Sequence, residues 1–287
     1  MRWVERLNEA LNYIENNITE ELLISEIADC AFMSAYYFQK GFSMLSGYTV
    51  GEYVRQRRLS IAGSELVSTN KKIIDIALKY GYDSPDSFTK AFTRFHGVTP
   101  TAARKDRAII KSLARLRITI SLEGGYVMDY KIVEKDSFTI MGVSKTFRYD
   151  TALEEIPEFW KEHYQAGKNE YVCGTYGVCI DEHKESDAFE YLIADDYIPG
   201  KEVPADFLTK VIPAHTWTIF PCTGAMPKAL QDVTKKIFAE WLPNSKDYEI
   251  AAGYNIELYS SLADYPKGNQ DESYYSEIWI PVKKLSI

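Results

Sequence analysis

SAYYFQKGFSMLSGYTV, at residues 34–50, and SPDSFTKAFTRFHGVTP, at residues 84–100, match each other at a fixed offset of 50 residues. The matched pairs are Ser34/Ser84, Phe38/Phe88, Lys40/Lys90, Phe42/Phe92, Gly47/Gly97 and Thr49/Thr99. Each copy follows a short apolar run that ends in a turn, ELLISEIADCAFM before the first and KKIIDIALKYGYD before the second. The duplication predicts two helix-turn-helix motifs, a pattern typical of two recognition helices that bind one DNA duplex.

The segments around the first copy predict how the two motifs are joined. Apolar residues at helical spacing predict a helix over residues 2–16, and Thr19 is a candidate cap for the next helix. Ser34 suits the N-cap of the first recognition helix, and Gly47 suits its end. Residues 50–67 predict one long helix of roughly 27 Å, near the roughly 34 Å between successive major-groove faces of DNA. This connector would place the two recognition helices about one turn apart.

The composition is that of a folded globular protein with room for two domains. Hydrophobic residues make up 46% of the 287 residues, and no apolar run is long enough to span a bilayer. Four cysteines without CxxC pairing favour a reduced, cytoplasmic compartment.

The net charge of −8 is distributed unevenly along the chain. Residues 1–105 hold 13 basic and 12 acidic residues, whereas residues 106–287 hold 20 and 29. The excess acid therefore lies outside the duplicated region, whose own net charge of +1 is weak for a DNA-binding module, because phosphate contacts dominate affinity. Residues available for a basic face between the motifs are Arg55, Arg57, Arg58, Lys71 and Lys72.

Residues 2–105 resemble the DNA-binding domain of the AraC/XylS family of bacterial transcription regulators. The resemblance rests on an IA…GY.S…F…F…G.TP pattern, formed here by Ile76, Ala77, Gly81, Tyr82, Ser84, Phe88, Phe92, Gly97, Thr99 and Pro100. Ala102 and Ala103 stand where the family has an arginine shortly after the proline, and Arg104 lies near by. The resemblance implies base-contacting positions at Tyr36, Gln39, Lys40, Asp86, Ser87 and Lys90.

The chemistry of these positions leaves more than one role open. Lysine reaches guanine and glutamine pairs with adenine in the major groove. Lys40 and Lys90 are equally suited to phosphate alone, since half or more of protein–DNA hydrogen bonds go to the backbone. Asp86 suits either an acceptor for cytosine or a cap for its own helix. We expect double-stranded DNA as a partner and residues 1–105 as the DNA-binding domain.

Beyond residue 105 the pattern changes. Residues 106–124 are expected to form a linker that runs into an edge strand. A pattern of strand, helix, strand, strand then occurs twice, first as FTIMGVSKTF, a helix over 153–165, GTYGVCI and AFEYLIA, and again as HTWTIFPCTG, a helix over 227–241, YNIELYS and YSEIWIPV. The expected fold is therefore multidomain, an all-α N-terminal domain followed by an α+β domain over residues 125–287. Antiparallel sheet with helices on one side leaves a groove between the halves as a ligand site.

Residues 126–287 resemble the gyrase-inhibitor-like (GyrI-like) effector-binding domain. The matching pieces are MDYKIVEKDSFTIMGVSKTF, IPAHTWTIFPCTG and SEIWIPVK. The order of the two domains resembles that of the Rob-type members of the AraC/XylS family. The resemblance implies a pocket glutamate near the final strand that meets cationic, aromatic, drug-like ligands, and this position falls on Glu277.

Glu277 and Trp279 share one face of the predicted final strand, because strand side chains alternate. A buried acid beside a tryptophan suits a cation, and burial is expected to raise the pKa of Glu277. The alternative is that this face is solvated and Glu277 is an ordinary surface acid. Further candidates for the ligand pocket, each of which also suits the core, are Trp160, Tyr176, Tyr191, Phe220 and Tyr254.

The sequence carries no familiar catalytic or cofactor motif, because GxSxG, P-loop and GxGxxG patterns are absent. His163, Cys173, Cys179 and His183 lie near one another, but their spacing fits no usual zinc pattern. The leading hypothesis is a ligand-responsive transcription regulator, not an enzyme, that needs no cofactor or metal. Its expected partners are DNA, a small-molecule effector and RNA polymerase. The alternatives are a C-terminal domain that hydrolyses a small molecule, or one that binds another protein.

Overall fold

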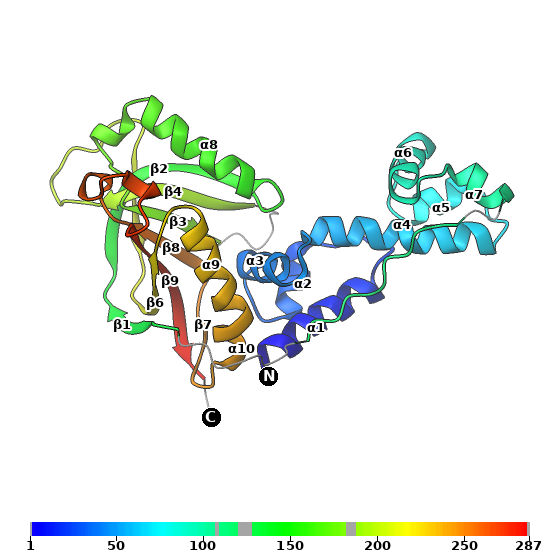
Figure 1. Ribbon diagram of the computed structural model, residues 1–287, viewed down its shortest axis with the longest axis horizontal. Helices are drawn as coiled ribbons and strands as arrows, with labels where there is room; N and C mark the ends of the chain where they lie inside the picture. The colour runs from blue at the N-terminus through cyan, green and yellow to red at the C-terminus, as the bar shows by residue number, and fades with distance from the viewer. Residues whose placement is uncertain (1, 107–108, 120–127, 182–187, 286–287) are drawn as a thin grey trace.

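The computed structural model describes residues 2–106, 109–119, 128–181 and 188–285, and it consists of a helical region followed by a large sheet (Figure 1). The helical region contains α1 (Arg2–Asn16), α2 (Ile24–Cys30), α3 (Ala35–Ser46), α4 (Val50–Ser68), α5 (Ile73–Lys79), α6 (Pro85–His96) and α7 (Pro100–Asp106). The pairs α2–α3 and α5–α6 are the two expected helix-turn-helix motifs. We call α1 to α3 the first unit and α5 to α7 the second unit; α4 connects them.

The duplicated serines and glycines delimit the two recognition helices, α3 and α6. Ser34 accepts a hydrogen bond from the Tyr37 amide at 3.4 Å, and Ser84 accepts one from the Ser87 amide at 3.2 Å. Gly47 and Gly97 end the helices with φ of 74° and 84°, values that glycine adopts without a Cβ clash. The predicted caps of the first recognition helix are thus confirmed, and the aligned residues Ser84 and Gly97 cap the second.

The prediction that Thr19 caps the second helix is wrong. α2 begins only at Ile24, its N-cap position is Leu23, and no side chain caps it. The Thr19 hydroxyl instead donates to the carboxylate of the adjacent Glu20 at 3.2 Å. The chain between them takes turn and extended conformations, so Thr19 lies too far from the first turn to reach it.

The sheet domain is built from two similar halves. Its strands are β1 (Lys131–Lys135), β2 (Phe138–Arg148), β3 (Tyr176–Ile180), β4 (Ala188–Asp196), β5 (Leu208–Ile212), β6 (His215–Thr223), β7 (Tyr248–Ile250), β8 (Tyr254–Tyr259) and β9 (Tyr275–Lys284). They form one sheet in the order β1-β6-β9-β8-β3-β4-β2-β5, with β7 paired to β9. The halves β2-α8-β3-β4 and β6-α9-β8-β9 join through the antiparallel β3–β8 pair, where α8 is Ala152–Gln165 and α9 is Lys228–Lys236. A π-helical turn, η2 (Ile237–Trp241), and α10 (Leu242–Asn244) extend α9.

Each face of the sheet has its own hydrophobic core. On the face covered by α8 and α9, which we call the helix face, Tyr191, Ile193 and Phe220 belong to the same core as Phe159 of α8. The opposite face, the far face, carries a separate cluster formed by Ile140, Tyr176, Val178, Ile180, Leu192, Ala194, Ile212, Trp217, Ile219, Tyr254, Ile256 and Trp279. Alternating side chains of one strand therefore enter different cores.

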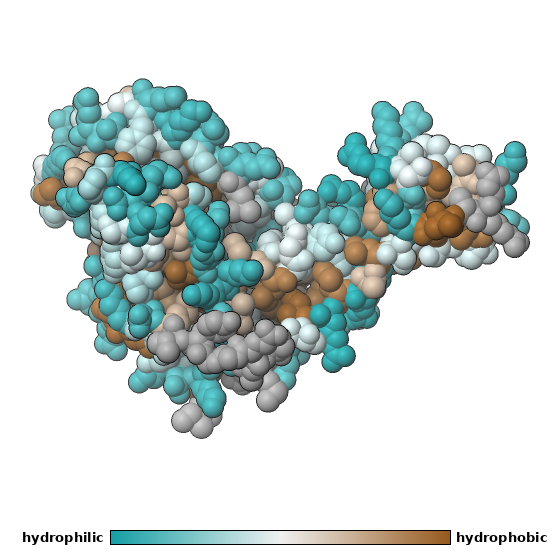
Figure 2. Space-filling model, viewed as in Figure 1, coloured by the Kyte–Doolittle hydropathy of each residue, from teal (hydrophilic) through white to brown (hydrophobic). Residues whose placement is uncertain are grey.

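The two helix-turn-helix units differ in how they are packed. Tyr37, Phe38 and Phe42 of α3 belong to the same core as the helix face of the sheet. The second unit has a core of its own, built around Phe88 and Phe92, and lies at the other end of α4 (Figure 1). Figure 2 shows hydrophobic side chains on this unit. Two exposed apolar residues of the unit are Ile74 and Leu78 of α5.

Residues 109–119 run in extended conformation from the second unit back along α4 and α1 (Figure 1). The Leu113 amide donates to Ser60 Oγ at 3.0 Å, and the Leu116 amide donates to the Tyr53 hydroxyl at 3.1 Å. Asn8 pairs with both backbone groups of Ile118, at 3.0 and 2.8 Å. These residues are a bound linker and contain no strand; residues 120–127, where the expected edge strand would continue, lie outside the described residues.

In the described parts of the chain, no helix combines the length and apolar character needed to cross a membrane.

Candidate effector site at the recognition helix

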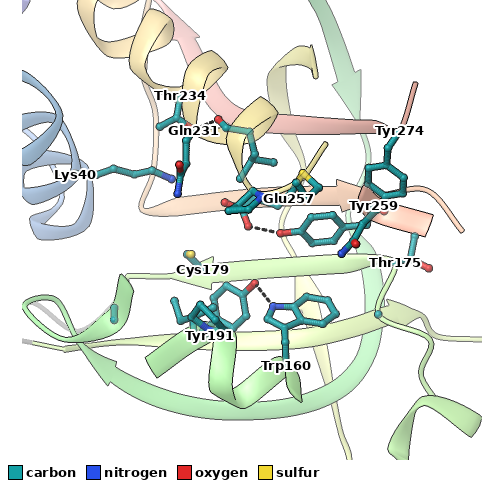
Figure 3. A pocket seen from close by; sticks show the side chains of 18 of the residues that line it. Lys40, Trp160, Thr175, Cys179, Tyr191, Gln231, Thr234, Glu257, Tyr259 and Tyr274 are labelled. Atoms are coloured by element: carbon teal, nitrogen blue, oxygen red, sulfur yellow. Dashed lines mark hydrogen bonds between the residues drawn. The ribbon is translucent and has the colours of Figure 1, made fainter. Parts of the chain in front are cut away.

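A cavity of about 930 Å³ lies where the two halves of the sheet domain meet the first unit. Its walls come from α8, α9, the strands β3, β4 and β8, and the recognition helix α3 (Figure 3). Pockets of roughly 300–1,000 Å³ are typical of small-molecule sites. The predicted groove between the halves therefore exists, and a helix of the other domain closes one side of it.

Strand alternation places the side chains at the floor of the cavity. Cys179 of β3, Tyr191 of β4, and Glu257 and Tyr259 of β8 all face it. Trp160 of α8 donates from Nε1 to the Tyr191 hydroxyl at 2.9 Å (Figure 3). The floor is therefore aromatic, with a carboxylate at its centre.

Glu257 is the acid of this cavity. Its Oε2 accepts a hydrogen bond from the Tyr259 hydroxyl at 2.6 Å. No lysine or arginine forms an ion pair with Glu257 in the part of the chain that the structure describes. A carboxylate among aromatic rings without a paired base suits a cation that also presents apolar surface.

The α3 wall of the cavity contains three residues that sequence predicts to contact DNA. Tyr36, Gln39 and Lys40 all line the cavity. The Lys40 ammonium donates to the Tyr36 hydroxyl at 2.8 Å and to Asn255 Oδ1 at 3.4 Å, and it lies 5.2 Å from the centre of the Tyr36 ring. The predicted DNA-reading face of α3 is thus directed at the sheet domain.

The three predicted DNA-contacting residues of α6 lie in different surroundings. Asp86, Ser87 and Lys90 are all exposed. Ser84 caps this helix, so Asp86 is not needed for that role. Their roles in DNA binding stay predictions.

Several of the basic residues between the motifs bind other parts of the chain. Arg57 forms an ion pair with Glu15 at 2.6 Å, and Lys71 forms one with Glu65 at 2.7 Å. Arg58 donates to the carbonyls of Ile18 and Glu20, at 2.8 and 2.6 Å respectively. These three side chains stabilise the helical region, which leaves less of the expected basic face for phosphate.

The sequence-predicted ligand residues divide between the two faces of the sheet. Trp160 and Tyr191 line the cavity. Tyr176, Tyr254 and Trp279 lie in the far-face cluster. Phe220 lies on the helix face but is fully buried against Trp241, with ring centres 5.1 Å apart, and does not line the cavity.

Glu277 does not line the cavity either. It is 6% exposed, so the alternative of an ordinary surface acid is wrong. Its carboxylate accepts hydrogen bonds from Tyr275 at 2.7 Å, Trp279 at 2.6 Å and Lys131 at 3.1 Å. Burial alone would raise its pKa, but these donors together outweigh burial and lower the pKa below the ordinary value, opposite to the expected direction.

Sequence reasoning missed Glu257, Tyr259 and Cys179. The segment YNIELYS gave a usable signal, because Asn255, Glu257 and Tyr259 alternate with apolar residues. The polar face of a strand in a two-layer domain is the face that borders a cavity or solvent. His183, part of the zinc arrangement considered from sequence, lies outside the described residues.

Comparisons with known proteins agree with this arrangement. Residues 131–282, more than half of the chain, match the family of integron-associated effector binding proteins (Cass2), and residues 27–106 match a helix-turn-helix domain family. The transcriptional activator AarP of Providencia stuartii is 40% identical over 98 residues, which cover 34% of this chain and 73% of AarP. The transcriptional regulator Rob of Salmonella typhimurium is 30% identical over 156 residues, which cover 54% of this chain and 53% of Rob.

Among solved structures, that of SAV2435 bound to tetraphenylphosphonium is 24% identical, with a TM-score of 0.47, over 54% of this chain and 94% of that one. The family match over residues 131–282 and the similarity to AarP settle the assignment of the two domains. The chain belongs to the integron-associated effector binding protein family, and it is an AraC-type DNA-binding transcription regulator that carries a GyrI-like effector-binding domain in the Rob-type order.

Proposed function

We propose that this regulator senses a cationic, aromatic small molecule, which binds in the cavity with Glu257 as its counter-ion. The observation that carries the proposal is the position of Glu257, which lies without an ion-pair partner among the described residues on a floor formed with Trp160, Tyr191 and Tyr259. Aromatic faces attract cations, and a carboxylate in a partly desolvated site binds an opposite charge more strongly than in water. In this proposal Glu257, on β8, takes the role that the family resemblance implied for Glu277.

The buried thiol of the cavity favours binding over turnover. Two thiols line the cavity, those of Cys173 and Cys179; Cys179 lies on the floor, and burial raises the pKa of its thiol to about 12. At neutral pH the thiol stays protonated, and the thiolate is the nucleophilic form of cysteine. This supports a sensor over a hydrolase, in keeping with relatives that are transcription regulators.

The proposed function includes RNA polymerase as a partner and the bacterial cytoplasm as the place of action. A transcription regulator acts where polymerase and chromosomal DNA are present. The exposed Ile74 and Leu78 of α5 support a protein contact on the second unit, because exposed apolar groups rimmed by polar residues mark interaction surfaces.

The test compares Glu257→Gln with Glu277→Gln in the full chain, by calorimetric titration with tetraphenylphosphonium. This probe is a bulky aromatic cation, and it is the ligand in the SAV2435 structure. Removal of the Glu257 charge is expected to weaken binding by about 2–5 kcal/mol, as when one partner of a buried charge pair is lost. Glu277→Gln should bind as wild type does, because Glu277 does not line the cavity. Loss of binding in Glu277→Gln alone would return the role to Glu277 and overturn the proposal.

A further inference from the structure

The DNA-reading face of α3 is covered by the effector-binding domain. Tyr36 is only 7% exposed, and its hydroxyl donates to Asn255 Oδ1 at 3.2 Å. The Tyr37 hydroxyl donates to the carbonyl of Tyr254 at 2.5 Å. A recognition helix contacts base edges with its N-terminal residues. We call this arrangement, in which α3 lies against the effector-binding domain, the closed arrangement. In it β8 covers the N-terminal residues of α3, so α3 cannot enter a major groove.

A second contact lies at the N-terminus of α3. The Tyr36 amide donates to Asp181 Oδ2 at 2.7 Å, and the other oxygen of Asp181 accepts from the Tyr149 hydroxyl at 2.6 Å. A carboxylate is favoured at the N-terminus of a helix, where free amides and the helix dipole attract negative charge. DNA phosphates bind helix N-termini for the same reason. Asp181 therefore occupies a position on α3 that is suited to a phosphate.

Lys40 is the cation of the closed arrangement. It extends from α3 into the cavity in which Glu257 projects from β8 (Figure 3). Within α3 its ammonium contacts the hydroxyl and the ring face of Tyr36, as cations do with aromatic rings, and across the contact between the domains it donates to Asn255 Oδ1 at 3.4 Å. Its counterpart in the duplication, Lys90, is exposed on α6 and does not line the cavity.

The closed arrangement also carries a cost. Gln39 Nε2 is buried in the contact and has no hydrogen-bond acceptor among the described residues. A buried donor without an acceptor loses the hydrogen bonds that water would provide. Release of α3 returns this amide to solvent, or to an adenine in the major groove.

From these contacts, and resting on the proposed function, we propose that Lys40 is an internal substitute for the effector. Its hydrogen bond to Asn255 Oδ1 joins α3 to the effector-binding domain, and a cationic aromatic effector displaces the ammonium from the cavity. The displacement frees Tyr36, Gln39 and Lys40 for DNA. The effector is thus an inducer of DNA binding by the first recognition helix.

The direction of the coupling follows from charge. In the closed arrangement a cationic ligand lies in the same cavity as the Lys40 ammonium, which repels it. After opening, Lys40 has left the cavity and the ligand pairs with Glu257 without this repulsion. It therefore binds the open state more tightly, and a ligand shifts an equilibrium toward the state it prefers. DNA also requires the open state, because it needs the residues that α3 buries when closed. Effector and DNA must then strengthen each other's binding by the same factor.

The first experiment titrates the full chain with tetraphenylphosphonium and compares Lys40→Met with Lys90→Met. Methionine keeps the length and helix preference of lysine and removes the charge. Lys40→Met should bind the cation about 10-fold more tightly than wild type, within the usual range of coupling between sites, whereas Lys90→Met should not change. Equal affinities in wild type and both variants would overturn the role of Lys40 and leave the proposed function intact. If no protein binds the cation, both proposals fail.

The second experiment measures affinity for a duplex that the full chain selects from a random-sequence pool. Tetraphenylphosphonium should raise the affinity of wild type about 10-fold, and Asp181→Ala should raise it without the cation. Asp206→Ala is the matched control, because Asp206 is an exposed acid of the same domain whose loss changes the net charge equally. If the cation lowers DNA affinity, it holds the two domains together, and the proposal is wrong.

Discussion

At the scale of the residue, Gly177 leaves room for Tyr191 and Tyr259, two aromatic side chains that line the cavity. It pairs with Ile193 across the β3–β4 register, and a Cβ on it would lie 3.1 Å from Cζ of Tyr191 and closer still to the hydroxyl. That hydroxyl cannot move aside easily, because Tyr191 is 1% exposed and accepts from Trp160. Glycine at this position thus allows an aromatic ring to lie over the strand.

Gly177→Ala is therefore expected to destabilise the protein by about 1–3 kcal/mol, as overpacking of a well-packed core does. Gly51→Ala is its control, because a Cβ at Gly51 of α4 meets nothing within 4 Å and alanine suits a helix. Urea unfolding of both variants measures the effect. Equal stability of the two would show that Tyr191 shifts at no cost.

The sequence pattern predicted Glu277 as the acid of the ligand pocket, whereas Glu257 is the acid that lines the cavity. β9 is apolar on both faces, since Ile278 and Ile280 enter the helix-face core while Trp279 lies on the far face. Alternation correctly grouped Glu277 with Trp279, but nothing in that strand marks which face the helices cover. β8 does differ between its faces, so Glu257 was the more predictable position.

At the scale of the element, α4 is more than a connector between two motifs. His96 of α6 is buried against it, and Gly63 of α4 leaves room for the imidazole ring. His96 Nδ1 accepts from the Lys111 amide at 3.1 Å, so Nε2 carries the proton and donates to the Leu59 carbonyl at 3.0 Å. One neutral imidazole therefore joins α6, α4 and the linker.

Stability of the second unit should fall in acid because of this residue. Desolvation lowers the pKa of His96 below the ordinary 6.5, so His96 takes up its proton at a lower pH in the folded state than in the unfolded state. The stabilisation is fully present above about pH 6.5 and decreases as pH falls toward the lowered pKa. Urea unfolding from pH 8 to pH 5.5 should show this loss, and His96→Gln should show a smaller dependence on pH. The same dependence in both proteins would exclude His96 as its source.

At the scale of the whole molecule, the helices, their order and the two halves of the sheet could be predicted from the sequence. Ser34 and Ser84 begin the recognition helices, and alternating strands follow patterns of period two. The contact between the domains could not be predicted in this way. Tyr36 and Tyr37 serve equally well in a helical core, in a DNA interface or against a sheet, and the sequence pattern does not distinguish these surroundings.

The duplication permits a test of whether the core of the second unit is independent of the core shared by the first unit and the effector-binding domain. Phe42 and Phe92 hold equivalent positions and are both fully buried, but Phe42 shares the core of the effector-binding domain whereas Phe92 lies in the separate core of the second unit. Replacement of either by alanine is expected to cost its core about 3–5 kcal/mol.

Phe92→Ala should therefore increase proteolysis within residues 73–103 while the affinity for tetraphenylphosphonium stays within about 2-fold of wild type, as for distant sites. Phe42→Ala should increase proteolysis and also weaken cation binding, because the loosened first unit packs against the sheet that forms the cavity floor. Limited proteolysis and calorimetry on the two full-length variants measure these effects. Equal loss of cation binding in both variants would mean that α4 and the bound linker couple the two cores into one cooperative unit, and that both recognition helices respond to the effector together.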